Sequence, residues 1–351
     1  MSRLTGFCRP FFLPGILLSI FLGINSAHGS RPSTEIREQP SVKNSSNKVM
    51  WNAVPVPEQA PCNRSGMADL PGVRLWYSDT GGDGPTVVLS HAHSGSADFW
   101  GYQQPVLTKA GYRVITYSRR GHGKSERGNE TDFGFADVDL HNLVVTFLGV
   151  DKFHLVGVAA GGGIAIDYAL SHPERLISLT IASSLIDVID PEYVKLLSNL
   201  HRKDLTRNIP NFYIELSASY RAGNPSERRR GLSWRKLVMS GDVQNLGKIS
   251  QRHTNKIIWK AVDSIKVPTL LMTGDADSYV PPSLLRLQAS HMKHAEVLII
   301  SEAGHAPNWE QPEAFNSAVL KFFQKQDGTT GGQSTTSPAN KNIVTLSAFA
   351  D

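Results

Sequence analysis

The chain has 351 residues, of which 40% are hydrophobic, and its formal net charge is +5. A chain of this length can bury a core large enough for one large domain or two small ones. The small positive charge argues against a nucleic-acid-binding protein, and two cysteines, Cys8 and Cys62, are too few for a disulfide framework or a cysteine metal cluster.

The first 29 residues have the pattern of a secretory signal peptide. Arg3 and Arg9 precede an apolar run from Phe11 to Leu22, and Ala27-His28-Gly29 supplies small residues at the spacing of a cleavage site. The run is shorter than the about 20 apolar residues that span a membrane, and an uncleaved signal anchor is the alternative. Cleavage would remove two arginines and no acid, which lowers the charge from +5 to +3. We therefore expect a secreted protein.

Two further segments lack hydrophobic periodicity. Residues 30–66 are polar and predict a flexible leader, and residues 326–351 are rich in Gly, Thr, Ser and Asn and predict a disordered tail. Asn44, Asn63 and Asn129 begin N-x-Ser/Thr sequons, which would make this a glycoprotein if the host glycosylates.

Between them, residues 67–325 alternate short apolar runs with amphipathic stretches. Several runs are almost entirely apolar, as in strands that are buried on both faces. The predicted strands are Val73–Asp79, Thr86–His91, Tyr112–Ser118, His154–Val158, Leu176–Ser183, Thr269–Gly274 and Ala295–Ile300. The predicted helices are Ala97–Ala110, Phe135–Leu148, Gly162–His172, Pro282–His291 and Pro312–Gln324.

This alternation predicts an α/β fold with a mostly parallel sheet and helices on both faces. Residues 185–265 interrupt the alternation with a helical pattern that contains several aromatic and arginine residues. An insertion of this size between two strands predicts a lid.

Ligands of such sheets bind beyond the carboxyl ends of the strands, so the segments that follow the strands carry the information on function. In chain order they read "AHSGSADFW", "RRGHGKS", "AAGGG", "DADSYVPP" and "EAGHAPNWEQP". Together these segments resemble the α/β-hydrolase superfamily, in its esterase, lactonase and cofactor-free haloperoxidase-like branch. The resemblance covers roughly Val73 to Phe323.

The family carries its nucleophile in the motif G-x-S-x-G, on a sharp turn from a strand into a helix. The matching residues are Gly157-Val158-Ala159-Ala160-Gly161, so the resemblance places Ala159 at the nucleophile position. Both glycines of the motif are present. Glycine is favoured at these positions because the strained turn leaves no room for Cβ atoms. No serine, cysteine or aspartate lies between Val156 and Ile166, so a shift of register supplies no nucleophile.

The other catalytic positions of the family are present. His305 matches the catalytic histidine, and the G-x-x-D pattern that begins at Gly274 makes Asp277 the catalytic acid. Asp275 is better interpreted as a turn or capping residue. Some relatives take the acid from the preceding strand, which would nominate Asp187 instead.

The resemblance also implies an oxyanion hole made of two backbone N–H groups. One is the N–H of Ala160, and the other is the N–H of His93, which follows the His91-Ala92 turn. Ala92 stands where the family has glycine. The side chains of His93 and Ser94 would line the pocket, unless they only pack the loop.

Three interpretations follow from the missing hydroxyl. The loss of a triad nucleophile costs on the order of 10⁶-fold in turnover, so an acyl-enzyme at residue 159 is excluded. The protein could be a non-covalent enzyme that uses His305 and Asp277 as a general base, a pseudo-enzyme that binds a small ligand, or a serine esterase or lactonase in which this copy has Ser→Ala at Ala159.

The expected partner is a small organic molecule. Tyr193, Phe212, Tyr213, Tyr220 and Trp234 in the insertion favour an apolar one. We expect no metal or organic cofactor, since the glycine turn lacks the G-x-G-x-x-G spacing. Arg228-Arg229-Arg230 predicts a solvated surface rather than a nucleic-acid site. We also expect no membrane span after signal cleavage, and the sequence does not predict an oligomeric state.

Overall fold

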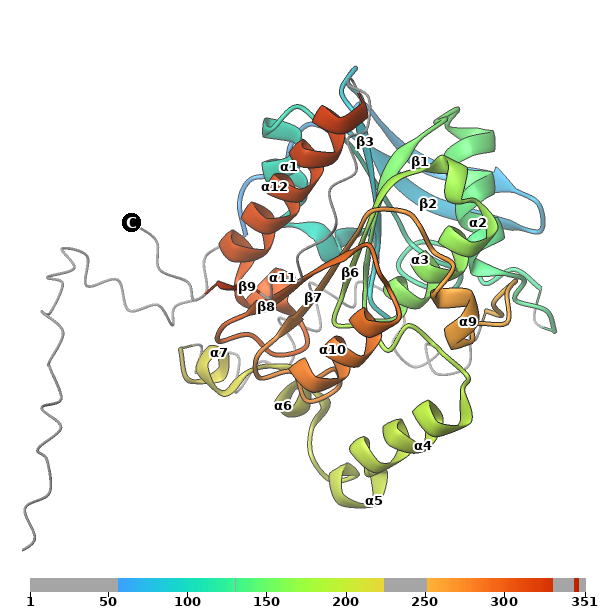
Figure 1. Cartoon of the computed structure of the whole chain (residues 1–351). Coiled ribbons are helices and arrows are strands. Elements are labelled where there is room, and N and C mark those ends of the chain that lie inside the picture. Colours follow the sequence, from blue (N-terminus) through green and yellow to red (C-terminus); the bar gives the residue numbers. More distant parts are fainter. Residues whose placement is uncertain (1–55, 130, 224–250, 331–343, 347–351) are drawn as a thin grey trace, which may run out of the picture. The chain divides into compact units, whose positions relative to one another are not determined.

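The computed structural model describes residues 56–129, 131–223, 251–330 and 344–346 (Figure 1). The predicted signal peptide, most of the predicted leader, Asn44, Arg228-Arg229-Arg230 and Trp234 lie outside these ranges. Among the described helices, none is long and apolar enough to cross a membrane.

A nine-stranded sheet forms the centre of the fold, in the order β1-β2-β4-β3-β5-β6-β7-β8-β9. β1 pairs antiparallel with β2, β2 pairs antiparallel with β4, and all other neighbours are parallel. The predicted mostly parallel sheet is therefore confirmed. The strands are β1 (Arg64–Leu70), β2 (Val73–Asp79), β3 (Thr86–Ser90), β4 (Arg113–Tyr117), β5 (Phe153–Val158), β6 (Leu176–Ala182), β7 (Thr269–Gly274), β8 (Ala295–Ile300) and β9 (Val344–Leu346).

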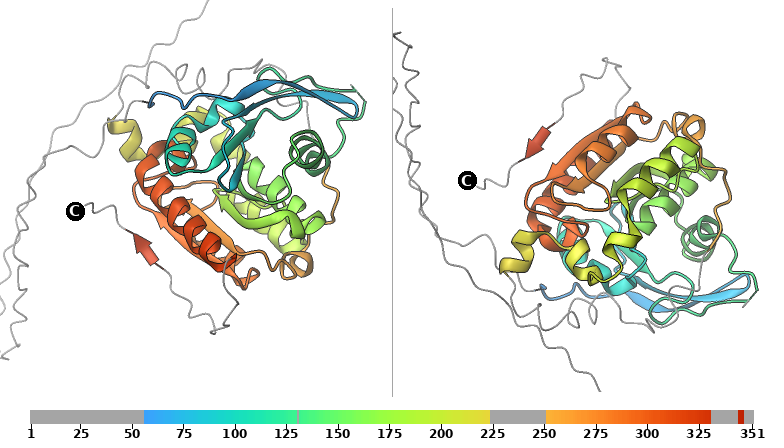
Figure 2. Two further views of the ribbon diagram at one scale, coloured as in Figure 1. Left: turned by 90° about the horizontal axis from the view of Figure 1, so that it is seen from above. Right: turned by 90° about the horizontal axis from the view of Figure 1, so that it is seen from below.

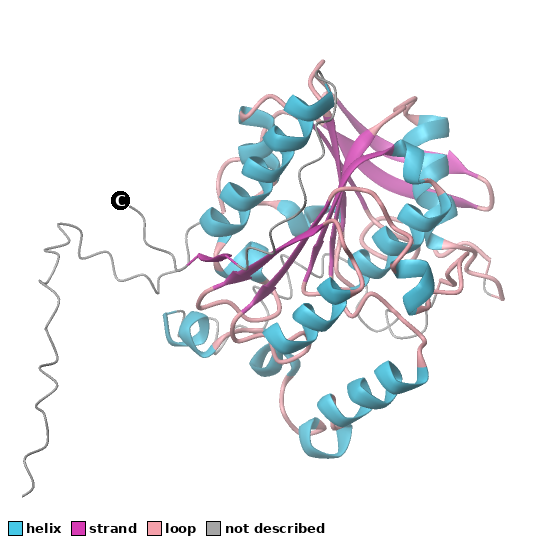
Figure 3. Cartoon of the chain, in the orientation of Figure 1, coloured by secondary structure: helices cyan, strands magenta, loops and turns pink. Residues whose placement is uncertain are grey.

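Helices cover both faces of this sheet (Figures 1–3). Alternate side chains of the central strands enter two separate apolar clusters, as the two-residue period of a strand requires. Val88 and Leu155 pack with α2, α3 and α10, whereas Val87 and Val156 pack with α1 and α12. These helices are α1 (Gln104–Lys109), α2 (Ala136–His141), α3 (Ala160–Ser171), α10 (Pro282–Ser290) and α12 (Pro312–Thr330).

The predicted insertion is helical in its described part. The helices α4 to α7 follow β6, and α9 precedes β7 (Figure 1). Pro191 is the first residue of α4 and Pro210 directly precedes α6, positions at which proline is compatible with a helix. Their bounds are α4 (Pro191–Leu200), α5 (Lys203–Thr206), α6 (Asn211–Glu215), α7 (Ala218–Gly223) and α9 (Trp259–Val262).

Several boundaries differ from the sequence-based prediction by one or two residues, and the predicted helix Ala97–Ala110 is divided into a short 3-10 helix, Ala97–Trp100, and α1. The largest differences lie at the two ends of the domain. β1 begins at Arg64, inside the predicted leader. Only Ala68 and Leu70 of this strand are buried, so its alternation in the sequence is too weak to predict a strand. α12 continues past residue 326 to Thr330, and β9 lies in the predicted tail, where it pairs with β8. Pairing with an existing strand edge can order a segment whose composition alone predicts a loop.

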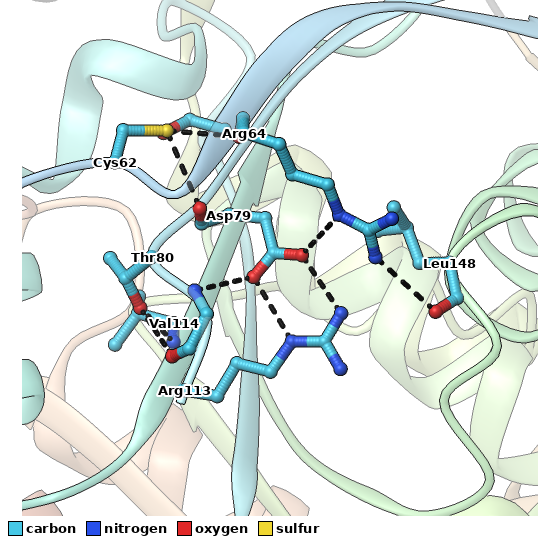
Figure 4. A network of polar contacts seen from close by, with 9 residues as sticks. Cys62, Arg64, Asp79, Thr80, Arg113, Val114 and Leu148 are labelled. Carbon is cyan, nitrogen blue, oxygen red and sulfur yellow. Dashed lines mark hydrogen bonds and ion pairs between the residues drawn. The ribbon is translucent and has the colours of Figure 1, made fainter. Parts of the chain in front are cut away.

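The antiparallel edge is held by a buried carboxylate (Figure 4). Asp79 is 1% exposed and accepts hydrogen bonds from Arg64 on β1 at 2.9 Å and from Arg113 on β4 at 2.8 and 3.0 Å. Burial favours the protonated acid, but the hydrogen bonds from Arg113, Gly81 and Arg64 lower the pKa of Asp79. We assign a structural role to this network: it joins three strands, and its residues do not follow the carboxyl ends of the parallel strands, where a ligand would bind.

Candidate functional site

The turn from β5 into α3 carries Ala159 in a strained conformation. Its φ is 49° and its ψ is −116°, a region that costs a residue with a side chain about 1–3 kcal/mol. The turn is fixed on both sides, because the Ala159 N–H donates to the Ala182 carbonyl at 3.0 Å and its own carbonyl accepts from the Gly162 N–H at 2.9 Å. This is the conformation that exposes a nucleophile in hydrolases of this type, here with a methyl group at its tip.

Glycine is required on both sides of the turn. A Cβ atom at Gly157 would lie 2.3 Å from the Gly161 carbonyl oxygen, and one at Gly161 would lie 2.1 Å from the Ser90 carbonyl oxygen. As the motif predicts, the surrounding backbone therefore leaves no room for a side chain at Gly157 or Gly161. The next two helix residues are also crowded, since a Cβ at Gly163 would lie 2.0 Å from a carboxylate oxygen of Asp187.

His305 and Asp277 are in direct contact. His305 follows β8 and Asp277 follows β7, and Nδ1 of His305 lies 3.0 and 3.1 Å from the two carboxylate oxygens of Asp277. One of these oxygens also accepts from the backbone N–H groups of Tyr279 and Val280 at 2.8 and 2.9 Å. Thr273 donates its hydroxyl to the other at 3.0 Å. These hydrogen bonds fix Asp277 in place, with its negative charge directed at the imidazole of His305.

The pKa values of this pair move in opposite directions. Burial alone would raise the pKa of Asp277, but the charge and hydrogen bond of His305 and two backbone N–H groups lower it to about 2. Burial alone would lower the pKa of His305, but the charge and hydrogen bond of Asp277 raise it, and Glu215 and Glu310 act in the same direction. Asp277 is therefore ionised at neutral pH, and it favours the protonated imidazole.

The two other candidate acids do not contact His305. Asp187 lies 3.1 Å from Nε2 of His253, and both Asp187 and the preceding Ile186 have φ near 50°. Asp275 is exposed, and its N–H donates to the Ile300 carbonyl at 2.9 Å. In geometry, Asp277 is thus the acid that accompanies His305.

The two expected oxyanion donors follow β5 and β3, which are neighbours in the sheet. Ala160 is the first residue of α3, where an N–H has no acceptor within the helix. The N–H of His93 also donates to no group within the described residues. Ala92 is buried, Ser94 is half-buried and the His93 side chain is exposed.

Sequence reasoning missed a buried carboxylate beside His305. Glu310 on α11 (Pro307–Glu310) is 6% exposed and accepts from the Ser217 N–H at 2.7 Å and from the Ala306 N–H at 3.2 Å. Burial raises the pKa of Glu310 to about 7. The "NWEQP" segment contained the signal, but a glutamate beside a helix start is usually exposed.

The same loop is joined to the insertion. The His305 N–H donates to the Glu215 carbonyl at 2.6 Å, and the Ser217 hydroxyl donates to the Glu302 carbonyl at 3.0 Å. Gly304 lies so close to this segment that a Cβ would be 2.5 Å from the Glu215 oxygen. Residues 215–217 of the insertion are therefore fixed to the loop that carries His305.

Two of the predicted lid aromatics pack against the same apolar cluster as Ala159. Phe212 and Tyr220 pack, as Ala159 does, against the apolar cluster that includes Val158 and Leu216. By contrast, the Tyr193 ring is buried against Trp259, and Tyr213 is 54% exposed. In the described ranges, no group of three or more metal-ligating side chains is present.

The chain resembles known proteins in both sequence and structure. Residues 85–312 match the family described as alpha/beta hydrolase fold. The chain is 27% identical to a 2-hydroxy-6-oxononadienedioate/2-hydroxy-6-oxononatrienedioate hydrolase of Burkholderia vietnamiensis, over 72% of this chain and 92% of that protein. It is 28% identical to the hydrolase of the same name from Klebsiella pneumoniae, with the same two coverages.

Solved structures show the same architecture. A bromoperoxidase from Bacillus anthracis is 26% identical with a TM-score of 0.58, over 74% of this chain and 100% of that one. An enol-lactonase from Burkholderia xenovorans is 22% identical with a TM-score of 0.60 and the same coverages. With the family match spanning more than half of the sequence, the chain belongs to the alpha/beta hydrolase family.

Proposed function

We propose that this protein is a non-covalent enzyme that uses His305 as a general base on a small, largely apolar organic molecule. The observation that carries the proposal is the contact between His305 and Asp277, made in a site whose nucleophile position holds Ala159. A protein that only binds a ligand needs neither a base nor a carboxylate that orients it.

The proposed chemistry follows from the atoms that are present. Asp277 accepts a hydrogen bond from Nδ1 of His305, which leaves the lone pair of the neutral imidazole on Nε2. This nitrogen takes a proton from water or from a C–H or O–H group of the ligand. The N–H groups of Ala160 and His93 would stabilise the oxyanion or enolate that forms.

The choice of ligand rests on the aromatic residues and on the relatives. Phe212 and Tyr220 supply apolar surface on the same cluster as Ala159. The named relatives are hydrolases of small organic molecules. Because residue 159 has no hydroxyl here, we infer that this chain does not attack its ligand through that residue.

The test begins with the ligand. Native mass spectrometry of the purified protein should identify a co-purifying molecule, whose turnover is then followed in the wild type, His305→Ala and Asp277→Asn. We expect a loss of about 10²–10⁴-fold in both variants. Unchanged turnover in His305→Ala would refute general-base catalysis and favour the binding protein.

A second candidate is a serine esterase or lactonase in which this copy carries alanine. The preserved strain of the turn at Ala159 favours it, because that conformation serves a nucleophile. Ala159→Ser should then hydrolyse p-nitrophenyl butyrate. If it does not, this candidate loses its support.

We also propose that the protein enters the secretory pathway, on the basis of residues 1–29. Sequencing of the mature amino terminus should give Ser30. An intact terminus on membrane-bound protein would instead indicate a signal anchor.

A further inference from the structure

The peptide group between Ala92 and His93 is held by three hydrogen bonds on its carbonyl oxygen. The Ala92 oxygen accepts from Nδ1 of His91 at 2.7 Å, from the Gly95 N–H at 2.9 Å and from Nη2 of Arg119 at 3.0 Å. A carbonyl oxygen has two lone pairs and commonly accepts one or two hydrogen bonds. This one is therefore unusually well fixed.

The protonation of His91 is set by its surroundings. Its Nε2 accepts from the Arg119 N–H at 3.0 Å, so the ring proton lies on Nδ1 and points at the Ala92 oxygen. Burial and the nearby charge of Arg119 lower the pKa of His91 well below its ordinary value. The ring is thus a neutral donor at neutral pH.

No carboxylate forms an ion pair with Arg119 in the described part of the chain, although the charge of Asp187 acts to raise its pKa against the effect of burial. Its side chain is 9% exposed, its one hydrogen bond goes to the Ala92 oxygen, and its Nε is buried without an acceptor. Buried arginines are normally paired with an acid, because an unpaired charge is costly. The next residue, Arg120, follows this rule with bonds of 2.6 and 2.7 Å to Asp139.

Such an arginine affects the other end of the peptide it contacts. The C=O and N–H groups of a trans peptide are coplanar and point in opposite directions. A charged donor on the oxygen of Ala92 fixes that plane and draws electron density from the nitrogen of His93, which makes its N–H a stronger donor. The following carbonyl, that of His93, lies 3.0 Å from Nε2 of His122, which fixes the loop on its other side.

We propose that Arg119 is a positioning residue, which acts through the Ala92 carbonyl to orient and polarise the N–H of His93 for an oxyanion. This rests on the proposed function in one respect only, namely that the His93 N–H faces the reacting oxygen. The hold of Arg119 on the peptide itself is independent of any reaction.

The first test measures the peptide directly. Histidine labelled with ¹⁵N gives one amide signal for each histidine of the protein, and the variant His93→Gln identifies the signal of His93. We expect Arg119→Met to move that amide resonance and to accelerate its hydrogen exchange, while Arg119→Lys, which keeps a charged donor, restores much of the wild-type position. An unmoved His93 signal in a folded Arg119→Met protein would overturn the proposal.

Arg120→Met is the matched control. It also removes a buried arginine, but one that pairs with Asp139 rather than with the loop. Its folding stability should fall while the His93 signal stays in place. An equal displacement of the His93 signal in Arg120→Met would show a general loss of packing and would also contradict the assignment. If Arg119→Met does not fold, Arg119→Gln gives the same comparison, because it keeps a neutral donor without the charge.

The second test measures the consequence for an oxyanion, in the Ala159→Ser background with p-nitrophenyl butyrate. Removing an oxyanion donor outright costs about 10²–10³ in kcat. Weakening it through Arg119→Met should lower kcat by roughly tenfold and leave KM nearly unchanged. A fall in kcat without a shift of the His93 signal would argue against this route. If the serine variant has no activity, the first test still decides the role of Arg119.

Discussion

At the scale of single residues, the pair of His305 and Asp277 controls the protonation of the site. The imidazole must be neutral to accept a proton, yet the carboxylate 3.0 Å away favours its charged form. The raised pKa of His305 means that the base becomes available only as the pH rises through that pKa. Activity should therefore increase from acidic to mildly alkaline pH.

Asp277→Asn should lower the pKa of His305, because it removes the attractive charge and leaves the burial that opposes protonation. The titration of the His305 ring is followed by NMR, which needs no substrate. We expect the midpoint to lie above the ordinary value of a histidine in the wild type and to fall in the variant. Equal midpoints would contradict the electrostatic role given to Asp277.

Glu310→Gln gives a second comparison for this titration. Burial raises the pKa of Glu310 to about 7, so this carboxyl group changes its charge near neutral pH. In Glu310→Gln the His305 midpoint should also fall, but by less, because Glu310 is the weakest of the three acids acting on His305.

At the scale of elements, the close approach of β5, α3 and β3 builds the turn around Ala159. Gly161→Ala should separate these elements, because the added methyl would lie 2.1 Å from the backbone oxygen of Ser90, which cannot rotate away. We expect a loss of about 3 kcal/mol or more of unfolding free energy, measured in urea. Gly66→Ala is the matched control, since no atom lies within 4 Å of the new methyl, and it should change stability by less than about 1 kcal/mol.

The elements also show what the sequence could predict. The seven predicted strands are present: the apolar runs of β3, β5 and β7 are buried on both faces, whereas β2 alternates between buried and more exposed residues. The family motif placed Ala159 and His305 after the strand ends. β1 was missed because an edge strand has little to bury, and β9 because three residues gain their order only from β8.

The residues that escaped prediction depend on contacts between distant segments. The "RRGHGKS" segment received no chemical role, since nothing in the sequence states that Arg119 reaches the carbonyl of Ala92 while Arg120 reaches Asp139. Likewise, the buried state of Glu310 depends on Ser217, which is 93 residues away in the chain.

At the scale of the whole molecule, aspartates hold the segment 251–255, in which the chain leaves the insertion and returns to the sheet. Each residue from Gln251 to Asn255 contacts an aspartate, at distances of 2.6 to 3.1 Å. The aspartate at the centre is Asp167 on α3, which is buried and accepts from the N–H groups of Thr254 and Asn255 and from the Asn255 amide. The acids involved are Asp132, Asp137, Asp139, Asp167 and Asp187.

Asp167→Asn should loosen this return. The amide can accept fewer of the three hydrogen bonds and turns its NH₂ group toward donors, so we expect a loss of about 2–4 kcal/mol of unfolding free energy. Limited proteolysis should cut the variant in the insertion sooner than the wild type. Asp132→Asn is the control, because its bond to Arg252 is exposed and should contribute little to stability. Equal sensitivity of both variants would show that burial of Asp167 is unimportant.

The bond between the His305 N–H and the Glu215 carbonyl sets a limit on how a ligand can enter. Any motion that lifts residues 215–217 away from the sheet must break this bond and the contact of Ser217 with Glu310. Opening at α6 and α7 would thus remove two hydrogen bonds that hold the loop of the base in place. Ligand exchange by this route would therefore disturb the base, whereas exchange that leaves residues 215–217 in place would not.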